Sequence, residues 1–371
     1  MTEDKELTVR NLFHLRKTSG EVGIEIEVEG NKVPLIQSDY WRSDNDGSLR
    51  GNSMEYVLDS PVKRTEVVTA LNNLKKHLAD HEANLDISNR CGVHIHLNVQ
   101  EFTFKQVMTF ACLYLMLEEI LVKFCGEERE GNLFCLRAKD ADYLVTGLRQ
   151  AMATGSLAHV QSHQYRYASI NMTALGKYGS LEFRSMRSTE DFDVISQWVE
   201  ILLKLKDQSL NFDTPTQLIE MMSANGADAF VEQILGPLSE LVQCPDMSMV
   251  VMNGVRIAQN IAYTKTKEPV KRKVSKEIIN WRDFADNIIE AEGNNNPRPG
   301  AELILTVAPP PQLPRGVAWT RELDMLWSES NVSIERGEII RASQFRREVF
   351  RILDRMRDRH RPAIRRVRRR D

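Results

Sequence analysis

The chain has 371 residues, of which 42% are hydrophobic and 27% charged, and it can bury a full core in one large domain or two smaller ones. A formal net charge of −3 predicts no general attraction to nucleic acid or membranes, although this total includes a strongly basic C-terminus. Five cysteines without a CxxC pair argue against a disulfide framework or a structural zinc site. The N-terminus lacks the apolar segment of a signal peptide, and no apolar run is long enough to span a bilayer. We therefore expect a cytoplasmic protein.

Alternating acidic and apolar residues predict a strand near the N-terminus. Glu25, Glu27 and Glu29 alternate with isoleucine and valine, and a later segment repeats the pattern with His94 and His96. Successive side chains of a strand point to opposite faces, so the polar members of each segment share one surface. Acids in a row repel one another unless a cation or a basic partner neutralises them. The pattern predicts a metal site; the alternatives are a solvated edge strand and surface or hydrogen-bonded histidines.

The rest of the chain up to residue 187 mixes strands with helices. The expected elements are a loop at 44–52, a strand at 54–58 that carries Glu55, a helix at 63–80, the histidine strand at 91–96, an apolar helix at 103–124 that backs the sheet, a loop region around 126–137, and a strand pair at 167–171 and 180–184 joined by a turn at 176–179.

Beyond residue 187 the pattern becomes helical. We expect an amphipathic helix at 191–210, a helix that begins at a capping box in 214–217 with proline at its first position, and a helix at 275–291. Three asparagines and six prolines predict a linker or extended loop at 293–316. The remainder, 317–371, is a basic helical tail in which 341–370 is arginine-rich and amphipathic.

The polar side chains of the alternating strands form one set, namely Glu25, Glu27, Glu55, His94, His96, Glu182 and Arg184. Carboxylates with one or two imidazoles suit Mg²⁺ or Mn²⁺, because zinc prefers more His or Cys and calcium favours loop ligands. Magnesium takes its remaining ligands from water and substrate phosphates, so the set predicts a nucleoside triphosphate. No P-loop motif is present. Arginines that could clamp phosphate oxygens are Arg137, Arg166, Arg184 and Arg187.

Four blocks of residues, in this order, resemble the putative amidoligase family of the glutamine synthetase and glutamate–cysteine ligase superfamily. They are Gly23-x-Glu25-x-Glu27; Asp46-Gly47-Ser48 with Glu55 and Ser60-Pro61; Cys91-Gly92-Val93-His94-Ile95-His96; and Asn171 with Leu181-Glu182-Phe183-Arg184 and Thr189. The resemblance covers roughly residues 20–190. It implies an α+β fold whose curved, mainly antiparallel sheet forms a funnel, with helices packed outside it. It also implies an ATP-dependent carboxylate–amine ligase that forms an amide or peptide-like bond through an acyl phosphate, and a phage origin.

Roles follow from the resemblance residue by residue. Glu25, His94 and Glu182 are similar to ligands of a metal that bridges the ATP phosphates, and Glu27 and Glu55 to ligands of a second metal.

The other polar residues are assigned in the same way. His96 and Arg184 resemble the residues that face the nucleotide or the transferred phosphoryl group. Arg187 and Arg137 are expected as further nucleotide contacts because of their charge, and not from the resemblance. Asp46 resembles a further metal ligand or a substrate contact, and Arg166 a binder of phosphate or carboxylate. The catalytic domain would span 18–292, with strand motifs in 20–190 and helices in 191–292.

Two alternatives remain open at this point. The same fold can act as an ATP-dependent phosphotransferase on a guanidino nitrogen. The chain could also be a non-catalytic structural or nucleic-acid-associated protein that uses its arginine-rich tail, which is otherwise a solvated or partner-packed helix. For the ligase, the expected partners are a small-molecule or peptide carboxylate and an amine.

Overall fold

The computed structural model describes the greater part of the chain, namely residues 7–86, 88–265, 321–335 and 349. The chain divides into two units, Met1–Pro269 and Val270–Asp371. In the second unit the structure describes helix α12 (Arg321–Glu335), which begins inside the expected basic tail. The helix expected at 275–291, the linker at 293–316 and the arginine-rich helix at 341–370, with any acidic or nucleic-acid partner assigned to it, lie outside the described residues apart from residue 349.

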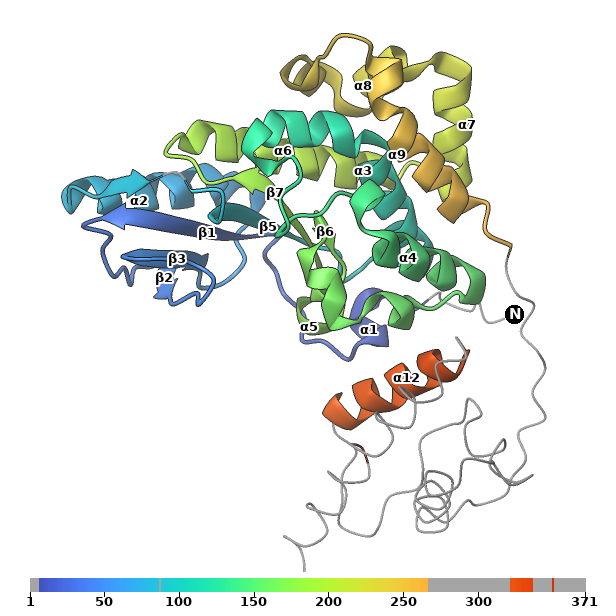
Figure 1. Cartoon of the computed structure of the whole chain (residues 1–371), viewed down its shortest axis with the longest axis horizontal. Coiled ribbons are helices and arrows are strands. Elements are labelled where there is room, and N and C mark those ends of the chain that lie inside the picture. Colours follow the sequence, from blue (N-terminus) through green and yellow to red (C-terminus); the bar gives the residue numbers. More distant parts are fainter. Residues whose placement is uncertain (1–6, 87, 266–320, 336–348, 350–371) are drawn as a thin grey trace, which may run out of the picture. The chain divides into compact units, whose positions relative to one another are not determined.

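The first unit contains a seven-stranded sheet that is antiparallel in every pairing and is not closed (Figure 1). The strands are β1 (Val22–Asn31), β2 (Trp41–Asp44), β3 (Ser53–Leu58), β4 (Asn84–Asp86), β5 (Gly92–Asn98), β6 (Ile170–Asn171) and β7 (Ser180–Arg187). Their order is β2-β3-β1-β5-β7-β6, and β4 pairs with the end of β1. The predicted α+β class with a mainly antiparallel sheet is confirmed.

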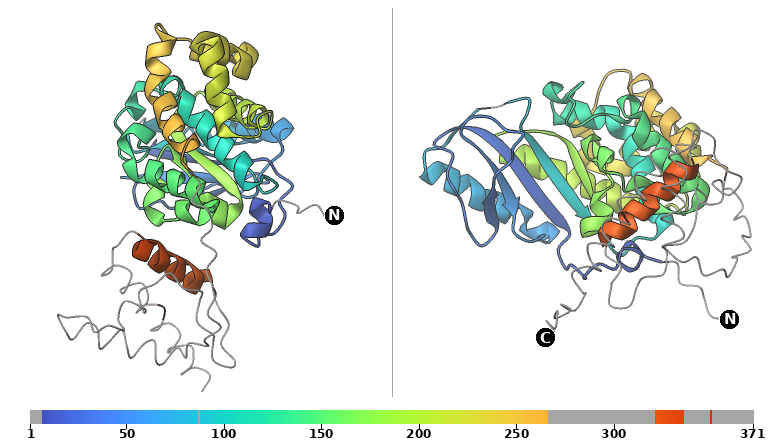
Figure 2. Two further views of the ribbon diagram at one scale, coloured as in Figure 1. Left: turned by 90° about the vertical axis from the view of Figure 1, so that its right-hand side faces the viewer. Right: turned by 60° about the horizontal axis from the view of Figure 1, so that its bottom comes forward.

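Helices α2, α3 and α6 cover one face of this sheet (Figures 1 and 2). The helices of the first unit are α1 (Val9–Leu12), α2 (Val67–Asp80), α3 (Phe104–Cys125), α4 (Asp142–Thr154), α5 (Ala174–Tyr178), α6 (Phe192–Ser209), α7 (Pro215–Asn225), α8 (Ala227–Leu235) and α9 (Met247–Ala262), with short 3₁₀ turns between them. The helices expected at 63–80, 103–124 and 191–210 correspond to α2, α3 and α6.

Helix α3 forms the centre of the core. Thr103 and Gln106 close a capping box at its start, and most of its side chains are buried. The ring of Phe110 lies 5.6 Å and that of Tyr114 4.9 Å from the ring of Phe183 on β7, which fixes the helix beneath the sheet. On its other side α3 packs against α9 so closely that a Cβ on Gly254 would lie 2.2 Å from the carbonyl oxygen of Leu115.

Three local predictions were wrong. The turn expected at 176–179 is instead the last part of helix α5 and its cap, Gly179, which adopts the left-handed conformation with φ of 73°. The strand expected at 167–171 is reduced to β6, because 163–167 form a 3₁₀ turn. Proline does occupy the first position of α7, but Thr214 makes no capping bond there, since its hydroxyl lies 2.9 Å from that of Thr216. The sequence pattern also gave no indication of α4.

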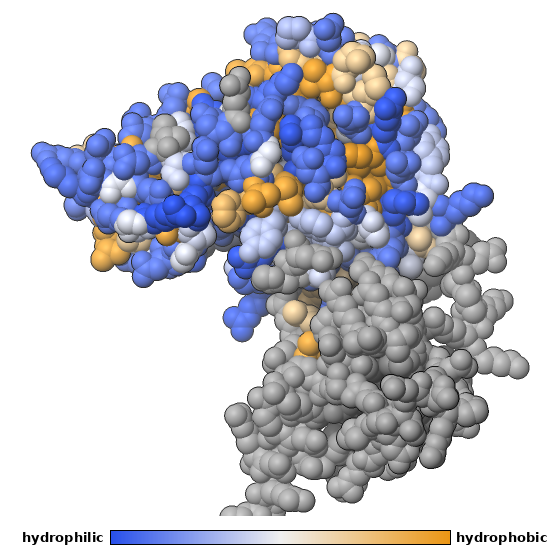
Figure 3. Space-filling model, viewed as in Figure 1, coloured by the Kyte–Doolittle hydropathy of each residue, from blue (hydrophilic) through white to orange (hydrophobic). Residues whose placement is uncertain are grey.

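The surface of the described residues is mixed. On the face shown in Figure 3, hydrophilic residues surround separate apolar patches. Exposed apolar side chains are common on folded proteins, because polar groups are too few to cover the surface. Within the described ranges, no helix combines the length and the apolarity needed to cross a membrane.

Candidate functional site

Strand register brings the acids and imidazoles of three strands together on the face of the sheet opposite α3. Glu25 on β1 pairs directly with His94 on β5, and His96 pairs with Glu182 on β7. Paired residues of antiparallel strands project from the same face. Gly23 lies opposite His96, and its missing side chain leaves room for the imidazole, because a Cβ there would lie 3.3 Å from the Cβ of His96.

A second acidic row runs across the neighbouring strands. Glu27 on β1 pairs with Glu55 on β3, which in turn pairs with Asp44 on β2. Asp46 joins this row from the loop after β2, where its carboxylate accepts the N–H of Ser48 at 2.7 Å. Burial of Glu27 is nearly complete, with 5% of its surface exposed.

A bulge in β7 directs Arg184 toward the same face. The register places Val93 opposite Met186 and Ile95 opposite Phe183, so two residues of β7 face one residue of β5. Ser185 turns to the core, where its hydroxyl lies 2.9 Å from that of Tyr114. The Arg184 guanidinium donates to Glu182.

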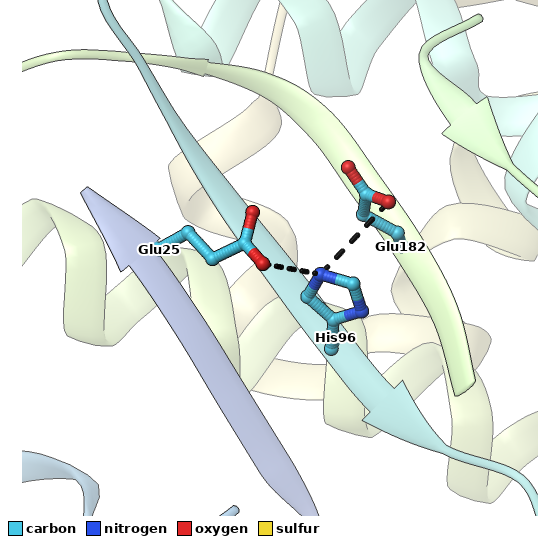
Figure 4. Close-up of side chains that lie close together, drawn as sticks. All are labelled: Glu25, His96 and Glu182. Carbon is cyan, nitrogen blue, oxygen red and sulfur yellow. Dashed lines mark ion pairs between the residues drawn. The ribbon is translucent and has the colours of Figure 1, made fainter. Parts of the chain in front are cut away.

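The resulting cluster is compact. Figure 4 shows three of its side chains, Glu25, His96 and Glu182, which extend from β1, β5 and β7. The Nε2 atom of His96 lies 3.3 Å from Glu25 Oε1 and 3.9 Å from Glu182 Oε2. His94 lies between the two acidic rows, with Nδ1 3.2 Å from Glu25 Oε2 and Nε2 3.8 Å from Glu27 Oε1.

Three overlapping groups in this cluster could each hold a metal ion. They are Glu25, His96 and Glu182; Glu25, Glu55 and His94; and Glu27, Asp46 and Glu55. The donor set is oxygen-rich with one imidazole at most in each group, which suits Mg²⁺ or Mn²⁺.

The Nε2 atom of His96 supports this assignment, because it is buried and, among the described residues, faces the carboxylates of Glu25 and Glu182 without making a hydrogen bond. The other ring nitrogen of His96 lies 3.1 Å from the Ser180 hydroxyl, which orients the ring. A buried polar atom without a partner is costly, so an atom that faces two carboxylates in this state fits a metal ligand.

Charges divide the carboxylates into two classes. Burial opposes ionisation of Glu25, but the charge of His96 and contacts with both histidines outweigh it and hold its pKa below the usual range. The pKa of Glu182 is also lowered, because the charges of His96 and Arg184 outweigh burial. Burial raises the pKa of Glu55 to about 8, with further contributions from the surrounding carboxylates, and burial also raises the pKa of Glu27. For Glu27, burial and the charge of Asp46 outweigh the opposing effects of His94, Arg184 and the hydrogen bond from Gly92.

Of the four arginines predicted to bind phosphate, two line the cavity over the cluster. This cavity has a volume of about 260 Å³ and includes Arg166 and Arg184 in its wall. Arg137 instead pairs with Glu119 at 3.0 Å, and Arg187 donates to the carbonyl of Phe124. Neither of these two contributes to the wall of the cavity.

A larger cavity of about 480 Å³ adjoins the first one along β1. The two share Glu25, His96, Lys177 and Tyr178 in their walls. Tyr178 places its ring edge-on to His96, with centroids 5.7 Å apart. Lys177 and Tyr178 were not predicted, since nothing in the sequence of α5 distinguishes them from surface residues.

Asn171 was also not predicted as a site residue, although it belongs to one of the four sequence blocks. Its amide donates to Glu182 Oε2 at 2.6 Å from the neighbouring strand β6. Its own oxygen accepts the N–H and the hydroxyl of Thr173. Asn171 therefore fixes the orientation of the Glu182 carboxylate.

A comparison with protein families agrees with this site. The family model described as "putative amidoligase enzyme" matches residues 37–206. The match includes β3, β5 and β7 with their acids and histidines and begins after β1. It confirms over these residues the resemblance seen in the sequence and supports a ligase-type enzyme. A search of curated proteins finds no match to the chain.

Proposed function

We propose that the chain is an ATP- and Mg²⁺-dependent ligase that joins a carboxylate to an amine. The observation that carries the proposal is the convergence of Glu25, Glu27, Glu55 and Glu182 with two histidines on one face of the sheet, within the family match or next to it. A purely structural cluster of this kind would be unfavourable, because burial and then the surrounding carboxylates disfavour the charged form of Glu55 and raise its pKa to about 8.

The residues divide the work by their positions. Glu25, His96 and Glu182 would hold one divalent cation, and Glu27, Asp46 and Glu55 a second one. When bound, such cations neutralise phosphate and carboxylate charge, so that two anions can approach each other. Both histidines lie beside Glu25 and Glu182: His96 joins these two acids in one group, whereas His94, 3.2 Å from Glu25 and 4.0 Å from Glu182, joins Glu25 and Glu55 in another.

The larger cavity suits the nucleoside of ATP. Its volume of about 480 Å³ falls in the range of small-molecule sites, and apolar side chains such as Leu15, Val57 and Leu58 form much of its wall. The triphosphate would then extend past Lys177 toward Arg184 and Arg166 in the smaller, acidic cavity. A funnel that receives ATP at one end and the carboxylate at the other is consistent with two adjoining cavities of different character.

The proposed reaction has two steps. An oxygen of the substrate carboxylate attacks the γ-phosphorus of ATP, and ADP leaves with the bridging oxygen. The amine nitrogen then attacks the acyl carbon, the bond from that carbon to the phosphate oxygen breaks, and the amine releases a proton. Arg184 and Arg166 would offset the charge on the transferred phosphoryl group, since guanidinium groups bind phosphate oxygens in pairs. Phosphorylation supplies the leaving group that a free carboxylate lacks.

The test is to incubate the full chain with ATP, Mg²⁺ and pools of amino acids, peptides and polyamines, following ADP and new amides by mass spectrometry. We expect ADP and an amide only when both a carboxylate and an amine are present. Glu182→Gln should abolish turnover, because it removes a metal-facing charge. The matched control Glu200→Gln changes an acid that pairs with Arg64 on the far side of the sheet, and it should remain active. A phosphorylated guanidino product would indicate the phosphotransferase instead, and no turnover with any pool would contradict both.

A further inference from the structure

Arg129 is an almost completely buried arginine beneath the site, with 2% of its surface exposed. It ends the 3₁₀ turn Glu127–Arg129 that follows α3. Its Nε makes no hydrogen bond to any of the described residues. Burial of an arginine is unfavourable unless hydrogen bonds satisfy its guanidinium, so the partners of Arg129 indicate what it does.

Its two terminal nitrogens bind the backbones of the two strands that carry the site. Nη1 donates to the carbonyl oxygen of Cys91 at 3.2 Å, at the start of β5. Nη2 donates to the carbonyl oxygen of Arg184 at 2.8 Å, at the bulge of β7. The guanidinium lies against Gly92, where a Cβ would be 3.0 Å from Nη2. This contact explains why a glycine precedes the histidine strand.

The bond to Cys91 reaches the acidic cluster through a single peptide group. The carbonyl of the Cys91–Gly92 peptide accepts from Arg129, and the N–H of the same peptide donates to Glu27 Oε2 at 2.8 Å. Hydrogen bonds in series polarise one another, so the charge of Arg129 strengthens the donor that faces Glu27. The Ser188 hydroxyl, just after β7, donates to the carbonyl oxygen of Glu27 at 2.9 Å.

The bond from Arg129 to the Arg184 carbonyl affects the group formed by Glu25, His96 and Glu182. The carbonyl that it binds belongs to Arg184, whose side chain donates to Glu182. Because the bulge decides whether Arg184 faces the site or the core, a donor that fixes the bulge backbone also fixes the partner of Glu182.

We propose that Arg129 is the positioning residue of this site: from beneath the sheet it fixes the Gly92 N–H on Glu27 and the bulge that presents Arg184. The inference rests on the proposed function in so far as the site binds divalent cations. It assigns Arg129 no contact with substrate.

The first test measures Mn²⁺ affinity of the full chain by electron paramagnetic resonance of the free ion. Arg129→Met should weaken binding by about 10- to 100-fold, as is typical when a group that orients metal ligands is lost. Arg129→Lys should recover part of the affinity, because an ammonium can still reach one of the two carbonyls. Arg64→Met is the matched control, since it removes an arginine that bridges Glu200 and Asp207 and should lower stability without changing Mn²⁺ affinity. Wild-type affinity in a folded Arg129 variant, or an equal loss in Arg64→Met, overturns the inference.

The second test needs no metal and no activity. In metal-free protein, hydrogen exchange of the Gly92 amide should be faster in Arg129→Lys than in the wild type, whereas amides of α6 should not change. If Arg129→Met does not fold, Arg129→Lys decides the outcome, and unchanged exchange at Gly92 in that variant overturns the inference. Absence of Mn²⁺ binding by the wild-type chain would instead count against the proposed function, and the exchange experiment would still decide the role of Arg129.

Discussion

Glu118 on α3 should make the stability of the protein depend on pH. The carboxyl is fully buried; it accepts the Ser169 hydroxyl and, at 2.9 Å, the N–H of Ala138. Burial raises its pKa from 4.5 to about 7, and the two hydrogen bonds only partly oppose this effect. The folded chain therefore holds a proton that the unfolded chain releases.

The sign and size follow from that difference. Because the pKa is higher in the folded state, the contribution of Glu118 is complete below pH 4.5, falls as the pH rises, and is lost above about pH 7. A difference of about 2.5 pKa units corresponds to roughly 3 kcal/mol. Glutamine mimics the protonated acid, since its oxygen can accept the Ala138 N–H while its amide donates to Ser169.

The assay is urea unfolding of the full chain at pH 5 and at pH 8, in the wild type and in Glu118→Gln. Between these pH values the free energy of unfolding should fall by about 2 to 3 kcal/mol more in the wild type than in the variant. Glu119→Gln is the control on the same helix; it should lose the pairs with Arg137 and Lys139 yet keep most of the pH dependence, because burial contributes more than the charge of Glu119 to the raised pKa of Glu118. Equal pH dependence in the wild type and Glu118→Gln would refute the reasoning.

Three further results are expected. In the presence of a chelator, Glu55→Gln should raise the free energy of unfolding by about 1 kcal/mol, because acids face Glu55 on both neighbouring strands. The same variant should gain less stability from Mn²⁺ than the wild type does. Urea unfolding with and without the ion measures both effects, and a metal-free variant less stable than the wild type would contradict the repulsion. Gly23→Ala should weaken Mn²⁺ binding several-fold with little change in melting temperature, since its Cβ would crowd His96; an unchanged dissociation constant would speak against that packing. Gly254→Ala should lower the free energy of unfolding by about 2 kcal/mol or more, because the new Cβ would overlap the Leu115 carbonyl. A melting curve like that of the wild type would exclude the close contact between α3 and α9.

Local pattern was sufficient for the main elements. The two-residue period around Glu25 and around His94 identified β1 and β5, and apolar spacing identified α3 and α6. Local signals failed where neighbours outside the segment decide the conformation. Helix α5 replaces a predicted turn, and Thr214 bonds to Thr216 rather than capping α7.

The sequence alone also determined the chemistry of the site, because residue type and alternation require carboxylates and imidazoles on common strand faces. Tertiary structure decided which of them meet. Strand order and register are set by pairing between distant segments, so only the folded sheet could place His96 with Glu25 and Glu182, leave Arg137 with Glu119, and put Arg129 beneath Gly92. The alternation along a strand determines which face of the sheet each side chain occupies. The residues that lie next to that side chain on neighbouring strands depend on hydrogen bonds to other parts of the chain.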